Sequence, residues 1–259
     1  MATEPQPLFL QRDQPPGVPP LALTGERTLP DVPEENYWFR RHLVVYEWIA
    51  ERIGGLRVVD MACGEGYGAD VLARRARSVV GVDANPEAHE HARLRYVRDN
   101  LRFARDMVET FAEACDAERT DAVIFLQTIE HVRNPGELLE HFKTLAPVAY
   151  ISTPNVLTLA PKGAQRSGNP WHVHEYRPQE FRALLEAHYS HVELLGLFHA
   201  RKLRAHELAL RAGWDAVHQR LGLTRAFYHR FTPAIDVRDF ALRPQGLDRA
   251  LDLVAVCRA

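Results

Sequence analysis

Five short apolar runs alternate with stretches of helical pattern through the middle of this 259-residue chain. The runs are LRVVD (56–60), SVVGVD (78–83), LRFARD (101–106), DAVIFL (121–126) and VAYIST (148–153). Strands covered on both faces are apolar throughout their length, and strands that alternate with helices form parallel sheets. The alternation therefore predicts an α/β fold.

Two further strands are predicted in the C-terminal part, from the runs HVELLGLF (191–198) and LDLVAVCRA (251–259). The chain between them has a largely helical pattern and is too long for a hairpin turn. Together with the five earlier runs, they predict a Rossmann-like, mostly parallel, seven-stranded sheet with helices on both faces. A helical insertion would then separate the last two strands.

The chain has no obvious internal boundary after its proline-rich start. Residues 1–22 hold clustered Pro and Gln without an apolar period, a composition typical of a disordered arm. The rest, 23–259, is predicted to form one domain. Its expected parts are an N-terminal helical segment (23–54), the sheet core (55–198), the helical insertion or lid (199–247) and the last strand (248–259).

Composition restricts the classes of partner. The formal net charge of −2 leaves no general basic surface for a nucleic acid. The chain has no apolar run long enough to span a membrane and no secretory leader pattern, so we expect neither a membrane partner nor export. Cys63, Cys115 and Cys257 form no CxxC pair, which argues against a disulfide framework or a zinc knuckle. These features predict a cytoplasmic protein that binds small molecules.

The stretch VVDMACGEGYG (58–68) joins the first predicted strand to a helix through three glycines. Without Cβ atoms, this loop lets a ligand approach the backbone at the carboxyl end of the strand, where α/β sheets bind ligands. Asp83 ends the next strand and could accept hydrogen bonds from two ribose hydroxyls. Dinucleotide folds instead place GxGxxG before a pyrophosphate, which Asp60 would repel. The loop therefore predicts a nucleoside with a positive charge, S-adenosylmethionine.

Five motifs resemble, in chain order, those of the class I S-adenosylmethionine-dependent methyltransferases: VVDMACGEGYG, VVGVDANPE, ARD, FLQTIEHV and ISTPN. The resemblance implies that fold, S-adenosylmethionine as methyl donor and S-adenosylhomocysteine as product. The cofactor contacts it implies are Asp60, Ala62, Gly64, Gly66 and Gln127 around the methionine, Asp83 at the ribose, and Asp106 and Met107 at the adenine, with Ala84 as a further contact.

The segment from LTGERTLPD to ENYWFRRH (23–42) is dense in polar and aromatic side chains, among them Glu26, Tyr37, Trp38, Arg41 and His42. We predict that it closes over the cofactor, with Tyr37 and Arg41 in contact with it. Aromatic rings beside a sulfonium would provide cation–π stabilisation. The alternative is that Tyr37 and Trp38 are ordinary packing residues.

Candidate catalytic groups follow the fourth and fifth predicted strands. Transfer of a methyl group to an alcohol needs in-line alignment and a base that accepts the hydroxyl proton. His131, beside Glu130, is the first candidate, because a histidine is largely neutral at physiological pH. The loop NPWHVHEY (169–176) brings His172 to the same face of the sheet as a second candidate. Alternatively, either histidine could cap a helix or pack in the core without taking part in the reaction.

The same side chains could hold a metal. Glu130, His131 and His172, with Glu175, could bind a divalent ion such as Mg²⁺, which would polarise an acceptor hydroxyl. Ubiquinone-type O-methyltransferases resemble this stretch but carry a further acid where Gln127 stands. An amide is a poorer ligand for a hard cation than a carboxylate, which weakens the case for a metal.

A longer set of motifs covers 23–259 and includes LTGERTLPD, ENYWFRRH and GLFHARKLR. This set resembles the mycobacterial sugar 1-O-methyltransferases of methylmannose polysaccharide synthesis, which implies a saccharide or oligosaccharide acceptor. The insertion would then be a lid or acceptor wall, or else a solvated excursion or homodimer contact. Aromatic residues there could stack on a sugar: His218, Tyr228, His229 and Phe231.

Three other functions stay open. An O-methyltransferase for a phenolic or polyketide-like acceptor would share every cofactor motif. A nicotinamide-dependent dehydrogenase would need GxGxxG and a Tyr-xxx-Lys pair, which the chain lacks. A sensor that binds S-adenosylmethionine without catalysis would not need the cluster of Glu130, His131 and His172.

Overall fold

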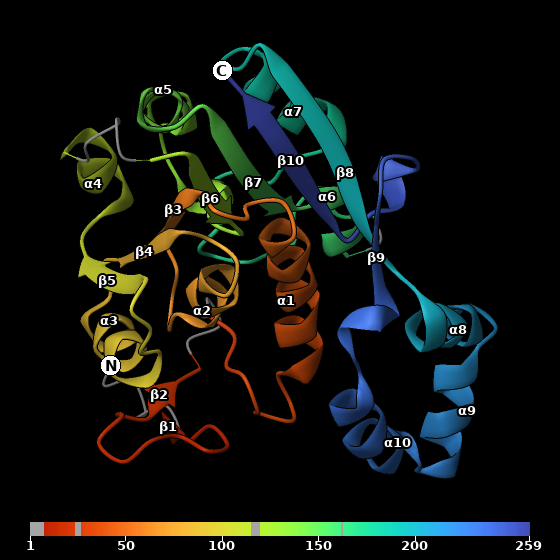
Figure 1. Ribbon diagram of the computed structural model, residues 1–259. Coiled ribbons are helices and arrows are strands. Elements are labelled where there is room, and N and C mark those ends of the chain that lie inside the picture. Colours follow the sequence, from red (N-terminus) through yellow and green to blue (C-terminus); the bar gives the residue numbers. More distant parts are fainter. Residues whose placement is uncertain (1–7, 24–26, 115–119, 162) are drawn as a thin grey trace, which may run out of the picture.

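The computed structural model describes residues 8–23, 27–114, 120–161 and 163–259. Its main feature is an eight-stranded sheet in the order β5-β4-β3-β6-β7-β10-β8-β9 (Figure 1). The strands are β3 (Arg57–Met61), β4 (Ser78–Asp83), β5 (Leu101–Arg105), β6 (Ala122–Leu126), β7 (Val148–Pro154), β8 (His191–His199), β9 (Phe240–Arg243) and β10 (Asp252–Arg258). Two residues named above, Glu26 and Cys115, lie outside the described ranges.

Strands β3 to β7 run parallel, and β10 lies antiparallel between β7 and β8. Consecutive residues of the buried strands face opposite sides of the sheet, as the pleat requires. Val58 and Ile124 join the core on one face, whereas Val59 and Phe125 join the core on the other. Both faces are therefore apolar, which explains the continuous apolar runs in the sequence.

Helices cover both faces of the sheet (Figure 1). One core contains side chains of α1 (Asn36–Ala50) and α2 (Tyr67–Ala73), and the other contains those of α5 (Pro135–Leu145) and α7 (Pro178–Glu186). The remaining helices of the sheet region are α3 (Pro86–Arg95), α4 (Val108–Ala114) and the short α6 (Val156–Leu159). None of the helices in the described ranges is long and apolar enough to cross a membrane.

The prediction of seven strands is wrong, because the segment 199–247 contributes a strand of its own. It contains α8 (Arg201–Arg211), α9 (Trp214–Leu221), α10 (Thr224–Phe231), η3 (Thr232–Ala234), η4 (Val237–Asp239) and β9, and η5 (Leu247–Arg249) begins at its last residue. Strand β9 pairs antiparallel with the end of β8, with Leu197 opposite Leu242. A strand of four residues is too short to show a recognisable period in the sequence, so only its pairing with β8 reveals β9. The three helices project beyond this edge of the sheet (Figure 1).

Residues 8–22, predicted to be a disordered arm, are packed against the domain. They include a two-stranded antiparallel sheet, β1 (Leu8–Phe9) and β2 (Leu21–Ala22). Leu21 is buried in a small cluster with Leu29 and Val32. His91 of α3 hydrogen-bonds both the Gln11 side chain, at 3.2 Å, and the Pro19 carbonyl, at 2.7 Å. These long-range contacts hold the segment, and the Pro-rich composition gives no sign of them.

Candidate functional site

The glycine loop between β3 and α2 takes left-handed backbone conformations, with φ of 56° at Ala62, 58° at Gly64 and 96° at Gly66. At Gly64 a Cβ would meet nothing within 4 Å, so its backbone is open to a ligand. The other two glycines are needed for packing instead. A Cβ on Gly66 would lie 2.8 Å from that of Ala92, and one on Gly68 would overlap the Tyr46 ring.

Asp83, at the end of β4, holds this loop. One carboxylate oxygen accepts a hydrogen bond from the Gly64 amide at 2.8 Å, and the other accepts one from the Asn85 amide at 2.8 Å. Each carboxylate oxygen can accept more than one hydrogen bond, so the group could also receive two vicinal hydroxyls. Asp83 therefore shapes the loop, and its contact with a ribose stays a prediction.

Asp60, at the end of β3, is fully buried below the loop. One of its oxygens accepts a hydrogen bond from the Tyr46 hydroxyl at 3.3 Å, and the other, Oδ2, has no partner among the described residues. Burial raises the pKa of Asp60 to about 8. The hydrogen bond from Tyr46 lowers this pKa, and the nearby charge of Asp83 raises it further. A buried carboxyl group with an unused oxygen can bind a cation that takes the place of its proton.

A narrow pocket of about 90 Å³, here called the loop pocket, lies against the glycine loop. Glu65 and Arg27 line it, and each has a buried atom, Oε1 and Nη1, without a hydrogen-bond partner among the described residues. Burial raises the pKa of Glu65 to about 8, against the lowering effect of the charge of Arg27. Neither side chain was among the predicted cofactor contacts. Glu65 lies inside the glycine motif, and Arg27 lies in the LTGERTLPD motif of the segment predicted to close over the cofactor.

A larger cleft of about 600 Å³, here called the adjoining cleft, opens next to the loop pocket. Four residues line both spaces: Arg27, Thr28, His42 and Gln127. Gln127 follows β6 with a φ of 53°, and its side-chain amide donates to the Ser152 hydroxyl at 2.9 Å. Burial lowers the pKa of His42 to about 4, so its ring is neutral at physiological pH. A ligand in one space would therefore touch the walls of the other.

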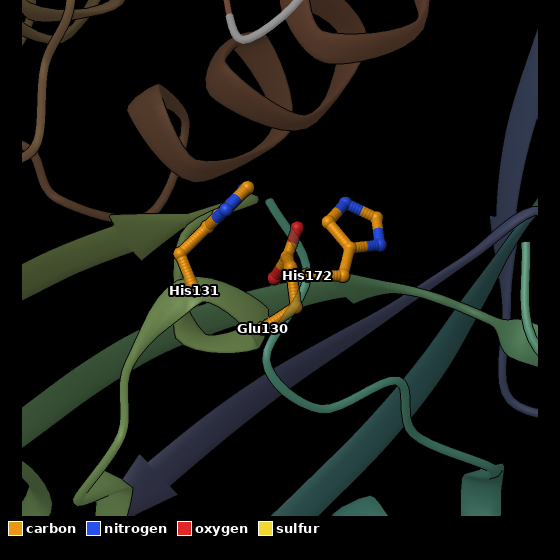
Figure 2. Close-up of side chains that lie close together, drawn as sticks. All are labelled: Glu130, His131 and His172. Carbon is orange, nitrogen blue, oxygen red and sulfur yellow. The ribbon is translucent and has the colours of Figure 1, made fainter. Parts of the chain in front are cut away.

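Glu130, His131 and His172 all line the adjoining cleft and lie close together, as the sequence predicted (Figure 2). One potential ligand atom from each lies within 4.8 Å of the other two. Figure 2 shows the Glu130 carboxylate between the two imidazole rings. Glu130 is only 2% exposed, and its Oε2 accepts a hydrogen bond from the Thr153 hydroxyl at 3.0 Å. Burial raises the pKa of Glu130 to about 8.

The two histidines are held by different partners. His131, in η2 (Ile129–His131), hydrogen-bonds the Trp171 carbonyl through Nδ1 at 3.0 Å. A carbonyl only accepts, so Nδ1 carries the proton and Nε2 is the basic nitrogen of the neutral ring. His172 bonds Glu175 through Nδ1 at 2.7 Å and the Asn169 amide through Nε2 at 3.0 Å. Glu175 therefore orients His172, rather than belonging to the group of three.

Three other predicted cofactor residues, Asp106, Met107 and Ala84, lie near the carboxyl end of β4. Asp106 lies beside the carboxyl end of β4, where its amide donates to the Asp83 carbonyl at 3.2 Å, and Met107 next to it is exposed. Ala84 is exposed between Asp83 and α3.

Tyr37 and Arg41 are not among the residues that line the loop pocket. Arg41 lines the adjoining cleft and pairs with Asp252, whereas the Tyr37 hydroxyl bonds His199 at 2.9 Å. That these two contact the cofactor stays a prediction.

The strand order, and the glycine loop with Asp60 and Asp83 beside it, are together typical of one class of enzyme. Residues 27–219 also match the sequence model of a methyltransferase domain. The chain therefore belongs to the class I S-adenosylmethionine-dependent methyltransferases, and S-adenosylmethionine is its cofactor.

Its relatives agree with this class. A probable S-adenosylmethionine-dependent methyltransferase of Mycolicibacterium smegmatis is 38% identical over 249 residues, 91% of this chain and 94% of that protein. The ubiquinone biosynthesis O-methyltransferase of Psychrobacter arcticus is 36% identical over 110 residues, 40% of this chain and 42% of that enzyme. A solved structure from Thermotoga maritima, described as a possible histamine N-methyltransferase, aligns with a TM-score of 0.58 at 14% identity. It covers 87% of this chain and 94% of its own, and shows the fold alone.

The unpartnered atoms around the loop pocket fit the cofactor. The methionine part of S-adenosylmethionine carries an ammonium and a carboxylate. Arg27 Nη1 lines the loop pocket and could donate to the carboxylate, whereas Asp60 Oδ2 lies below the glycine loop, outside the pocket lining, and could accept from the ammonium. Charged hydrogen bonds of this kind offset the cost of burying each group alone. Bound cofactor would therefore satisfy groups that are costly to leave unpaired.

We expect Asp83→Ala to weaken S-adenosylhomocysteine binding by roughly tenfold to a hundredfold, because it removes charged hydrogen bonds to the ribose and to the loop. Titration calorimetry of the variant measures this. Asp99→Ala is the matched control and should leave the affinity unchanged, since Asp99 is exposed and precedes β5, at the edge of the sheet opposite the glycine loop. An unchanged affinity for Asp83→Ala would refute the ribose assignment.

Cofactor affinity should also depend on pH. Without ligand, Asp60 is mostly protonated below its pKa of about 8, so an ammonium must displace a proton to bind. Linkage then weakens S-adenosylmethionine binding by up to about tenfold per pH unit below 8. Above pH 8 the affinity falls again as the amino group of the ligand loses its proton. We expect 5′-methylthioadenosine, which lacks the amino group, to show no such maximum, and Asp60→Asn to flatten it. A flat profile for S-adenosylmethionine would contradict the assignment.

Proposed function

We propose that the protein transfers the methyl group of S-adenosylmethionine to a hydroxyl of a saccharide or glycosylated metabolite. The observation that carries the proposal is the character of the adjoining cleft. Of its 15 lining residues, 11 are polar or charged, and Trp38 adds an aromatic face. A polyhydroxylated ring needs many hydrogen-bonding partners and stacks on an aromatic side chain. A phenolic or polyketide-like acceptor, the alternative, would use fewer of these polar groups.

His131 is the proposed general base. Its Nε2 is the basic nitrogen, since Nδ1 donates to Trp171. It belongs to the adjoining cleft next to Gln127, which also lines the loop pocket, so an acceptor hydroxyl could lie between His131 and the cofactor. The base takes the hydroxyl proton as the oxygen attacks the methyl carbon and the bond from carbon to sulfur breaks. His172, fixed by Glu175 and Asn169, and buried Glu130 would position the acceptor.

The same three side chains support a second mechanism, in which they hold a divalent cation such as Mg²⁺. Their ligand atoms are close enough to share an ion, and the bond from Glu175 to His172 is the kind that orients a metal-binding histidine. The cation would lower the pKa of the acceptor hydroxyl. His172 could then bind it only after the Asn169 amide moves away from Nε2.

The test is turnover with a panel of methylated and unmethylated oligosaccharides and small phenols, each with Mg²⁺ or with a chelator. S-adenosylhomocysteine release and product mass are followed, with His131→Gln as the blank. We expect one methyl to be added to a saccharide. Turnover with phenols alone would overturn the saccharide proposal, and cofactor binding without any turnover would favour a sensor. Loss of saccharide turnover with chelator selects the metal mechanism over the histidine base.

A further inference from the structure

A second large cavity, here called the arginine cavity, lies at the edge of the sheet where β8 ends. Its volume is about 590 Å³, close to that of the adjoining cleft, and within the usual range for small-molecule sites. Helix α6 stands between the two spaces, with Leu159 lining the adjoining cleft and Leu157 and Thr158 lining the arginine cavity. Helix α8 and η5 provide other parts of its wall, near the right edge of the sheet in Figure 1.

Four arginines from three separate elements line this cavity. Arg204 and Arg211 come from α8, Arg243 ends β9, and Arg249 belongs to η5. Within the described part of the chain, only Arg211 has a carboxylate partner, Glu207. The Arg243 guanidinium lies over the Phe198 ring, 4.1 Å from its centroid.

The arginines outnumber the acidic residues in the wall, which are Glu207 and Asp248. Glu207 is already engaged, since His199 bonds it at 3.3 Å as well as Arg211. His199 is in turn held by the Tyr37 hydroxyl at 2.9 Å. The cavity wall therefore carries more positive than negative charge. The hydrogen bonds that join Arg211, Glu207, His199 and Tyr37 fix one part of this wall.

Like charges gathered in one cavity repel each other, and a bound anion offsets that cost. Guanidinium groups match the geometry of a phosphate, to which they donate two parallel hydrogen bonds. The apolar part of the wall, Leu157, Leu208 and Leu251, could contact the carbon skeleton of the same ligand. We propose that the arginine cavity is a second ligand site, separate from the acceptor site, for a phosphorylated small molecule the size of a sugar phosphate.

The test is titration calorimetry of the full chain with glucose 6-phosphate at constant ionic strength, because salt screens exposed charges. The comparison ligands are glucose, glucuronate and inorganic phosphate. Arg204→Gln and Arg249→Gln each remove a charge from an exposed side chain and should leave the fold intact. Arg225→Gln, on the exposed surface of α10 and outside the cavity wall, is the matched control.

We expect glucose 6-phosphate to bind more tightly than the three comparison ligands. Arg204→Gln and Arg249→Gln should each weaken it by about tenfold, the usual effect of losing one charged hydrogen bond. Arg225→Gln should match the wild type, and all variants should bind S-adenosylhomocysteine equally well. Absence of binding, equal binding of glucuronate, or equal affinity in all three variants would overturn the proposal. The last result would place the phosphate elsewhere, for example in the adjoining cleft.

Discussion

Replacing His131 with glutamine should lower kcat by roughly a hundredfold to ten-thousandfold, the usual contribution of a general base. Glutamine keeps the size and polarity of the side chain but cannot take up the proton. S-adenosylhomocysteine affinity should stay unchanged, because His131 lines the adjoining cleft and not the loop pocket. Steady-state kinetics and calorimetry measure the two quantities separately.

His174→Gln is the matched control for that substitution. His174 lies in the same loop as His172, but its ring packs against Tyr176 with centroids 4.4 Å apart, and it does not line the adjoining cleft. Its kcat should stay near that of the wild type. Equal loss of turnover and of cofactor affinity in His131→Gln would show that His131 supports the structure rather than the reaction.

Removing Arg41 should destabilise the fold by about 3–5 kcal/mol, the usual cost of leaving a buried charge without its partner. Arg41 and Asp252 have side chains only 6% and 1% exposed, and their ion pair joins α1 to the start of β10. A second hydrogen bond, from Arg41 Nε to Asp252 Oδ2, measures 2.7 Å. Arg41→Met leaves the Asp252 carboxylate buried alone. Urea unfolding measures the change in the free energy of unfolding.

Two further variants test the cause. Arg41→Met combined with Asp252→Leu removes both charges and should recover part of the stability. Arg57→Met breaks a pair of similar geometry with Asp121, whose side chains are 37% and 30% exposed, and should cost no more than about 1 kcal/mol. An equal loss in Arg41→Met and Arg57→Met would show that burial of the Arg41 pair is not the deciding factor.

The centre of the fold and much of the site could be predicted from local patterns. Apolar runs fix the parallel strands, because a strand covered on both faces has to be apolar at every position. Parallel strands end at one edge, so residues after successive strands meet there. For that reason the sequence predicted that Asp83 lies near the glycine loop, and that Glu130 and His131 lie near His172.

Tertiary structure alone decided the features that depend on pairs distant in sequence. Residues 8–22 pack because His91 and a small apolar cluster receive them, and β9 exists because β8 offers an open edge. Arg27 reaches the loop pocket, Arg41 pairs with Asp252, and arginines of three elements meet in one cavity. The sequence determined which local elements form and which chemistry the strand ends carry. The tertiary structure determined which distant side chains meet, because such contacts depend on the packing of whole elements and leave no local period.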